Sequence, residues 1–188
     1  DKAVDAVREC AEAGVGSCLI ITSGFAEVEG GGVDAQKTLV DIARRSGMRL
    51  VGPNCLGFIS PGRGINASFA HVQPAPGKIA LVSQSGAILA SLLDWAAGRG
   101  IGFSHVVSLG DMSDIDFGDM LDYLALDRAT RSILLYVENV TEARKFMSAA
   151  RIASRAKPVV VVKAGRSQAG AKAALSHTGA LAGSDAVY

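Results

Sequence analysis

A segment rich in glycine and alanine surrounds one histidine, His177, and carries the residue types that chemistry on phosphate requires. It runs from Lys163 to Gly183 and offers few bulky side chains to a core. Three cations precede the histidine, at Lys163, Arg166 and Lys172, and can offset negative charge. Glycine allows close backbone approach, and a neutral imidazole is a nucleophile. We therefore interpret the segment as a loop that carries a phosphoryl group on His177. A solvent-exposed, inert histidine is the alternative.

A second polar group, Ser83-Gln84-Ser85-Gly86, joins an apolar stretch to an expected helix. Free backbone N–H groups, the positive end of the helix and two hydroxyls together favour an anion-binding site. The nucleophile elbow of the α/β-hydrolases does not fit, because Ser83 stands where that motif needs glycine. A serine that only caps the helix explains the tetrapeptide equally well.

An acid, Glu138, follows the apolar stretch Ile133–Val137. A carboxylate there can accept a hydrogen bond from one imidazole nitrogen, which fixes the tautomer and leaves the other nitrogen free to attack phosphorus. A solvated loop acid explains Glu138 equally well when it is taken alone. The run Gly52–Gly57 also follows an apolar stretch, and its spacing by itself indicates only a turn with a polar tip.

The elements that must position these residues follow from apolar periodicity, which alternates between helices and short buried strands. Helices are predicted over Val4–Ala13, Asp34–Arg45, Gly86–Gly98, from Asp116 and over Thr141–Arg155, with Asp34, Asp116 and Thr141 as N-caps. Strands are predicted over Ser17–Thr22, Met48–Val51, Lys78–Val82, Phe103–Leu109, Ile133–Val137 and Pro158–Val162. This α/β pattern predicts a doubly wound parallel sheet in the second half of the chain.

Ligands of such sheets bind beyond the carboxyl ends of the strands. The topology should therefore bring together four loops: Ser83–Gly86, Gly110–Ile115, Glu138–Asn139 and the His177 loop. The run 52–77 holds four of the five prolines and shows no clear periodicity. We place a domain boundary near residues 70–77, which divides the chain into 1–72 and 73–188.

Composition excludes several function classes. The net charge of +1, from 19 basic and 18 acidic residues, favours neither nucleic acid nor a membrane surface as a partner. No apolar run reaches the roughly 18 residues of a membrane span. No signal peptide is visible, and the missing initiator methionine suggests a fragment. Three cysteines without metal or disulfide spacing indicate reduced thiols in a cytoplasmic protein and no metal site.

Taken together, these segments resemble the NDP-forming acyl-CoA synthetases, the superfamily of succinyl-CoA synthetase, and above all the branch of ADP-forming acetyl-CoA synthetases. The resemblance covers nearly the whole chain. The residues that carry it are Ile21-Thr22-Ser23-Gly24-Phe25-Ala26-Glu27, Gly52-Pro53-Asn54-Cys55-Leu56-Gly57, Ile79-Ala80-Leu81-Val82-Ser83-Gln84-Ser85-Gly86, Lys163-Ala164-Gly165-Arg166-Ser167 and Ser176-His177-Thr178-Gly179-Ala180-Leu181-Ala182-Gly183.

The resemblance implies the C-terminal part of a Rossmann-like CoA-binding domain, followed by a flavodoxin-like subdomain that ends in the phosphohistidine loop. It assigns catalysis to His177, which would be phosphorylated, and to Glu138, which would orient it. The implied phosphate-binding residues are Ser83, Gln84, Ser85, Gly86 and Gly179. The residues implied to line the thiol end of CoA are Ser23, Gly24, Pro53, Asn54 and Cys55.

The reaction implied by the resemblance interconverts acyl-CoA, ADP and phosphate with a carboxylic acid, CoA and ATP. It implies ATP or ADP and Mg²⁺ as further cofactors, bound mainly by an ATP-grasp domain or subunit that this sequence lacks, in an oligomeric assembly. A second hypothesis is a synthetase-like, acyl-CoA-sensing part of a protein lysine acetyltransferase. A third, a generic nucleotide-binding Rossmann module, leaves the His177 loop unexplained.

Overall fold

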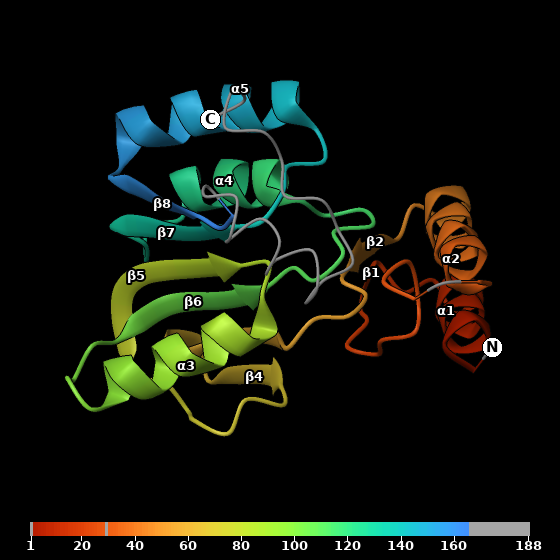
Figure 1. The fold of residues 1–188 in the computed structure, drawn as a ribbon, viewed down its shortest axis with the longest axis horizontal. Coiled ribbons are helices and arrows are strands. Elements are labelled where there is room, and N and C mark those ends of the chain that lie inside the picture. The colour runs from red at the N-terminus through yellow and green to blue at the C-terminus, as the bar shows by residue number, and fades with distance from the viewer. Residues whose placement is uncertain (1, 29, 166–188) are drawn as a thin grey trace.

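The computed structural model describes residues 2–28 and 30–165. His177 and Gly179 lie outside the described residues. The first part of the chain forms a two-layer unit of two helices and a small sheet (Figure 1). Its elements are α1 (Lys2–Glu12), β1 (Ser17–Leu19), α2 (Gly32–Ser46) and β2 (Arg49–Val51), and β1 pairs with β2 in parallel. Leu39 of α2 and Leu50 of β2 are fully buried in its core.

The second part is built on a six-stranded sheet with the strand order β4-β3-β6-β5-β7-β8. Its strands are β3 (Gly57–Ser60), β4 (Ile65–Ser68), β5 (Pro76–Ser83), β6 (Phe103–Ser108), β7 (Ser132–Val137) and β8 (Val159–Lys163). Its helices are α3 (Gly86–Ala97), α4 (Phe117–Leu126) and α5 (Ala143–Ala156), and a short 3₁₀ turn covers Pro61–Arg63. The strands β5 to β8 pair in parallel in the order 2-1-3-4, which is the flavodoxin-like arrangement. The predicted doubly wound parallel sheet is confirmed.

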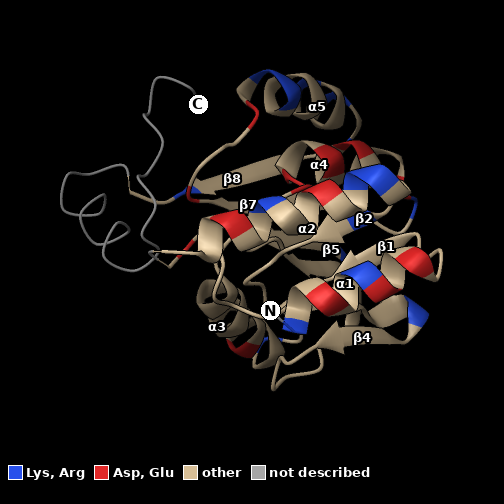
Figure 2. Ribbon diagram, turned by 90° about the vertical axis from the view of Figure 1, so that its right-hand side faces the viewer, with Lys and Arg blue, Asp and Glu red and all other residues tan. Residues whose placement is uncertain are grey.

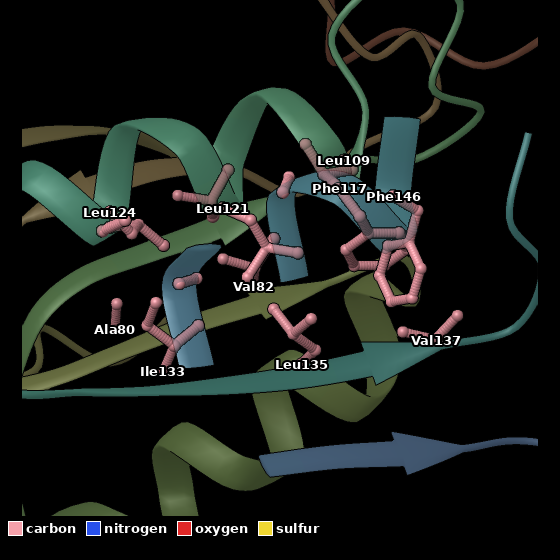
Figure 3. Packing of buried hydrophobic residues seen from close by; sticks show 14 of the residues in the cluster. Ala80, Val82, Leu109, Phe117, Leu121, Leu124, Ile133, Leu135, Val137 and Phe146 are labelled. Carbon is pink, nitrogen blue, oxygen red and sulfur yellow. The ribbon is translucent and has the colours of Figure 1, made fainter. Parts of the chain in front are cut away.

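Helices cover both faces of this sheet. Figure 1 shows α4 and α5 on one face and α3 on the other. Along β5 the side chains alternate between the two faces, so that Ala80 and Val82 pack toward α4 while Leu81 packs toward α3. In Figure 3 the side chains of Val82 and Leu135 point from the strands toward Leu121 of α4. Burial on both faces explains the apolar stretch Ile79–Val82 of the central strand β5, whereas the valines of the edge strand β8 are largely exposed.

The predicted N-caps had mixed outcomes. Asp116 caps α4 as predicted: its Oδ1 accepts hydrogen bonds from the N–H groups of Gly118 (2.8 Å) and Asp119 (3.1 Å). The caps predicted at Asp34 and Thr141 were wrong. The residue at the N-cap of α2 is Gly31 and at that of α5 is Glu142, and neither makes a side-chain cap bond. Acids and hydroxyls favour the first turn as well as the cap, so their sequence signal does not fix the starting residue.

The proline-rich run 52–77 has more regular structure than its sequence suggested. It contains the antiparallel hairpin β3–β4, and β3 pairs antiparallel with β6. Residues 57–68 therefore belong to the six-stranded sheet, as its antiparallel edge. These strands are short and β4 is largely exposed, so no extended apolar run marks them. The division of the chain near residues 70–77 stays a prediction.

The turn after β2 and the loop after β6 clamp each other through their backbones. The N–H of Asp111 donates to the carbonyl oxygen of Pro53 (3.0 Å), and the N–H of Ser113 donates to that of Gly52 (3.1 Å). Gly110 sits at the contact with a φ of 56°, and a Cβ there would lie 2.1 Å from the oxygen of Pro53. Only glycine permits this approach. The clamp joins the two parts of the chain.

The outer surfaces of α1 and α2 carry interspersed acidic and basic side chains and form no patch of a single sign (Figure 2). On α2, for example, Asp34 and Lys37 form an exposed ion pair of 3.4 Å. The interspersed signs agree with the net charge of +1 of the sequence. Among the described residues, the structure has no helix of the length and apolarity needed to cross a bilayer.

Asp116→Ala should lower the free energy of unfolding by about 1–2 kcal/mol, because two N–H groups of α4 lose their acceptor. Urea denaturation measures this loss. Glu142→Ala is the matched control, since Glu142 occupies the N-cap of α5 without a cap bond. A control loss as large as that of Asp116→Ala would contradict the capping role.

Gly110→Ala should destabilise the protein more than Gly100→Ala, by at least about 2 kcal/mol, since the added methyl group meets the backbone of the 52–55 turn. Gly100 is the control because it also has a positive φ, of 65°, but a Cβ there meets nothing within 4 Å. Both variants pay the left-handed backbone cost of about 1–2 kcal/mol. Thermal and urea denaturation compare them, and equal losses would show that the clamp contributes nothing.

Candidate active site at the carboxyl edge of the sheet

The carboxyl ends of the central strands meet at one edge, as the topology predicts, and the side chain of Gln84 connects them. Its Oε1 accepts hydrogen bonds from the N–H groups of Glu138 and Asn139, each 3.0 Å long. Its Nε2 donates to Oδ1 of Asn139 (2.8 Å). Its own N–H donates to the carbonyl oxygen of Tyr136 (3.1 Å). Gln84 was predicted to bind phosphate; the structure places its amide on the loop after β7, and its contact with phosphate stays a prediction.

The neighbouring residues build the start of α3. Oγ of Ser85 caps the helix by accepting from the N–H of Ile88 (3.3 Å), and Ser85 is buried. Oγ of the fully buried Ser83 donates to the carbonyl oxygen of Ser85 (2.7 Å). The Ser83 hydroxyl therefore donates within the turn, whereas Ser85 only accepts there, and binding of phosphate by either residue stays a prediction. Helix α3 begins here. The N–H groups of its first turn, which starts at Gly86, and its positive end can be directed at an anion.

Glu138 follows β7 directly and lies half-buried at the same edge. The N–H of Ala164, just after β8, donates to the carbonyl oxygen of Val137 (2.9 Å). The chain therefore leaves β8 beside Glu138 and enters the segment of His177. The catalytic prediction for His177 and the phosphate-binding prediction for Gly179 fall outside the described residues, so both stay predictions.

The 52–55 turn presents one polar side chain at its tip. Asn54 is exposed and has a φ of 54°, a left-handed conformation that asparagine tolerates well. Its N–H donates to the carbonyl oxygen of Thr22 (2.9 Å). Pro53 is buried, with a cis peptide bond to Gly52. The bond from Asn54 to Thr22 holds the turn against the loop after β1, which contains the exposed residues Ser23 and Gly24.

Cys55 is the buried last residue of this turn, and its thiol donates to the carbonyl oxygen of Ile20 (3.3 Å). Burial raises the pKa of the Cys55 thiol to about 11, despite a hydrogen bond to the backbone of Gly57 that lowers it. The thiol is therefore neutral near pH 7 and is a poor nucleophile. Cys55 can contribute to a CoA site through packing and shape, and its prediction as a CoA-lining residue stays open.

Asp111, in the loop after β6, lies at the tip of the turn, and sequence reasoning missed it as a site residue. Its Oδ1 accepts a hydrogen bond from Nδ2 of Asn54 (3.2 Å). Burial raises the pKa of Asp111 to about 7; the bond from Asn54 lowers it, and the nearby Glu27 raises it again. The available signal was its place in the loop Gly110–Ile115, which topology had already assigned to this edge.

Within residues 2–28 and 30–165, no cluster of three or more histidine, cysteine or acidic side chains could hold a metal ion. Two histidines pair with carboxylates instead. Nε2 of the buried His105 lies 3.1 Å from Oδ2 of Asp127, and Nε2 of His71 lies 2.8 Å from Oδ1 of Asp94 at the surface. The arrangement at the edge suits binding and transfer of an anionic group by helix dipole, backbone and carboxylate.

Comparisons with known proteins agree with this description. The model of the succinyl-CoA ligase like flavodoxin domain matches residues 76–188. The chain is 50% identical to acetate–CoA ligase (ADP-forming) I of Archaeoglobus fulgidus, over 97% of this chain and 27% of that protein. It is 47% identical to the alpha subunit of acetate–CoA ligase (ADP-forming) I of Pyrococcus furiosus, over 97% of this chain and 39% of that subunit.

A solved structure from Ca. Korarchaeum cryptofilum shares the fold. It is a dinucleotide-forming acetyl-coenzyme A synthetase 1 in complex with phosphate and ADP. Its TM-score is 0.93 at 39% identity, covering 100% of this chain and 40% of that one. The chain thus spans between about a quarter and two fifths of the length of these relatives. The flavodoxin-like assignment and the resemblance to NDP-forming acyl-CoA synthetases are confirmed, and the chain belongs to the family of succinyl-CoA ligase-like flavodoxin domains.

Proposed function

We propose that the protein containing this chain is an ADP-forming acyl-CoA synthetase. It would interconvert acyl-CoA, ADP and phosphate with a carboxylic acid, CoA and ATP, through a phosphohistidine at His177. One observation carries the proposal: the Ser85-capped start of α3 and Glu138 lie at the edge where β8 ends, and in the sequence β8 leads directly into the segment that contains His177. A helix N-terminus, an acid and an incoming histidine are the parts that phosphoryl transfer to nitrogen needs.

The steps follow from these parts. Phosphate attacks the thioester carbonyl, which releases CoA and forms an acyl phosphate. His177 then attacks phosphorus, and the carboxylic acid leaves. Positive potential at Ser85 and Gly86 stabilises the phosphoryl group at this stage, and Gly179 allows the backbone to approach it. Glu138 holds one ring nitrogen of His177 so that the other carries the lone pair.

The thiol end of CoA would lie along the 52–55 turn and the loop with Ser23 and Gly24. The exposed, fixed amide of Asn54 fits a ligand that carries amide groups, as the thiol arm of CoA does. Cys55 would shape the floor, since its buried neutral thiol is not available as a nucleophile.

The nucleotide would bind elsewhere. Phosphoryl transfer to ADP needs charge compensation by Mg²⁺ and cations, and we assign this step to an ATP-grasp domain or subunit. The subunit name of the Pyrococcus furiosus relative supports a partner chain. A cytoplasmic, oligomeric enzyme acting on a small carboxylic acid is part of the proposal. The alternative, an acyl-CoA-sensing part of a lysine acetyltransferase, receives no support from the relatives described above, which are named as ligases or synthetases.

The complete protein incubated with labelled ATP and Mg²⁺ should acquire acid-labile, base-stable phosphate, and His177→Ala should acquire none, because the nucleophile is gone. His71→Ala is the matched control, since that histidine pairs with Asp94 at the surface, and it should label normally. An unlabelled wild-type protein would overturn the synthetase function and favour the sensor.

Glu138→Gln should slow phosphohistidine formation by at least about tenfold, by analogy with carboxylates that orient metal-bound histidines, whose loss typically costs about 10–100-fold. Rapid-quench labelling measures the rate, and a thermal melt checks the fold. Glu142→Gln, on the exposed residue that precedes α5, is the control and should keep the wild-type rate. An unchanged rate in Glu138→Gln would remove Glu138 from the mechanism.

A further inference from the structure

Three polar side chains from separate segments meet beside the 52–55 turn. They are Glu27 from the loop after β1, Asn54 from the turn and Asp111 from the loop after β6. The two oxygens of Asp111 have different surroundings. Oδ1 accepts the bond from Asn54, whereas Oδ2 is buried and accepts no hydrogen bond from the described residues. A buried carboxylate oxygen without a donor is costly, which calls for an explanation.

Glu27 provides one. Its carboxylate accepts hydrogen bonds from the N–H groups of Gly24 and Phe25, the latter 3.0 Å long. Its own burial raises the pKa of Glu27, but these backbone bonds outweigh that effect, and the net pKa lies below the usual value. Glu27 therefore stays ionised. Its carboxylate also lies within hydrogen-bonding reach of Asp111. Two carboxylates have only acceptor atoms, so they form a hydrogen bond only when one of them holds a proton.

Of the two carboxyl groups, Asp111 is the one that holds the proton. Its pKa is raised to about 7 by burial first, against the bond from Asn54, and then by the charge of Glu27. Within residues 2–28 and 30–165, no cation contributes to the pKa of Asp111. Arg49 of β2 is bound to Asp114 (2.9 Å) and Asp119 (3.5 Å). The thiol of Cys55 at the end of the turn is neutral over the same pH range.

We propose that Asp111 is a positioning residue, which shares one proton with Glu27 and thereby fixes the side chain of Asn54 for the thiol arm of CoA. The identity of this ligand rests on the proposed function. The neutral carboxyl donates from Oδ2 to Glu27 and accepts from Asn54 at Oδ1. This orientation directs Nδ2 of Asn54 toward Asp111 and leaves its amide oxygen to accept a hydrogen bond. The chain of bonds runs from the 24–25 backbone through Glu27 and Asp111 to the turn.

The sign of the pH effect follows from the raised pKa. Between the unfolded value near 4 and the folded value near 7, the folded protein holds a proton that the unfolded chain has lost. The bound proton therefore contributes fully to the free energy of unfolding below the unfolded pKa. Its contribution falls as the pH rises from the unfolded to the folded pKa. Above the folded pKa it falls no further. Above about pH 7 the two carboxylates repel, and the bond between Asp111 and Glu27, which fixes the orientation of the Asp111 carboxyl group beside Asn54, is lost.

Asp111→Asn tests the proposal, because an amide accepts from Asn54 and donates to Glu27 without titrating. The probe is acetyl-CoA, whose sulfur does not ionise, and the readout is its KM in the complete protein from pH 6 to 8.5. If only the protonated form binds, the wild-type KM should rise about 30-fold by pH 8.5. The KM of Asp111→Asn should stay near the low-pH wild-type value throughout. Asp122→Asn, on an exposed residue of α4, should keep the wild-type profile.

Thermal melts give a second readout that needs no ligand. Asp111→Asn should be more stable than the wild type at pH 8.5 and close to it at pH 5. Equal pH profiles of KM in the two proteins, or a stability difference that does not grow with pH, would overturn the shared proton. If no protein binds acetyl-CoA at any pH while the melts behave as expected, the proton stands and the CoA-ligase function fails.

Discussion

The hydrogen bonds of the Gln84 amide are the interaction on which the candidate site depends. One side chain, at the end of β5, accepts from two successive N–H groups after β7 and donates to Asn139. A planar amide with one acceptor and two donor sites can make these bonds at once only in one orientation. The start of α3 and the backbone of Glu138 are therefore held as one rigid unit. The proposed phosphoryl transfer would need this rigidity, because small displacements of a reacting group lower the rate.

The backbone clamp at Gly110 performs the corresponding task between the two parts of the chain. The 52–55 turn belongs to the first part and the loop after β6 to the second. Because the backbones meet at Gly110 without a side chain between them, the turn lies against the edge of the six-stranded sheet. A ligand seated on the turn is thereby brought toward the start of α3. The clamp also places Asp111 beside Asn54, which explains why a carboxyl group is buried at this position.

Burial has opposite consequences for two groups at this turn. It raises the pKa of the Cys55 thiol to about 11 and so keeps it inert at neutral pH. It raises the pKa of Asp111 to about 7, which is within the range where proteins work. The same physical effect thus keeps one group neutral and lets the other hold or release a proton near pH 7. Neither outcome follows from residue type, since an exposed cysteine or aspartate would titrate near its usual value.

The sequence by itself determined the alternation of apolar strands and amphipathic helices, and with it the parallel sheet and the edge where its loops meet. Apolar periodicity records which faces are buried, so β5 to β8 and their helices were predictable. The hairpin β3–β4 was not, because its short, partly exposed strands gain their stability from pairing with β6. Only the tertiary structure decided the roles of Gln84, Gly110 and Asp111. Their partners lie tens of residues away in the chain, and contacts and burial of that kind leave no local pattern in the sequence.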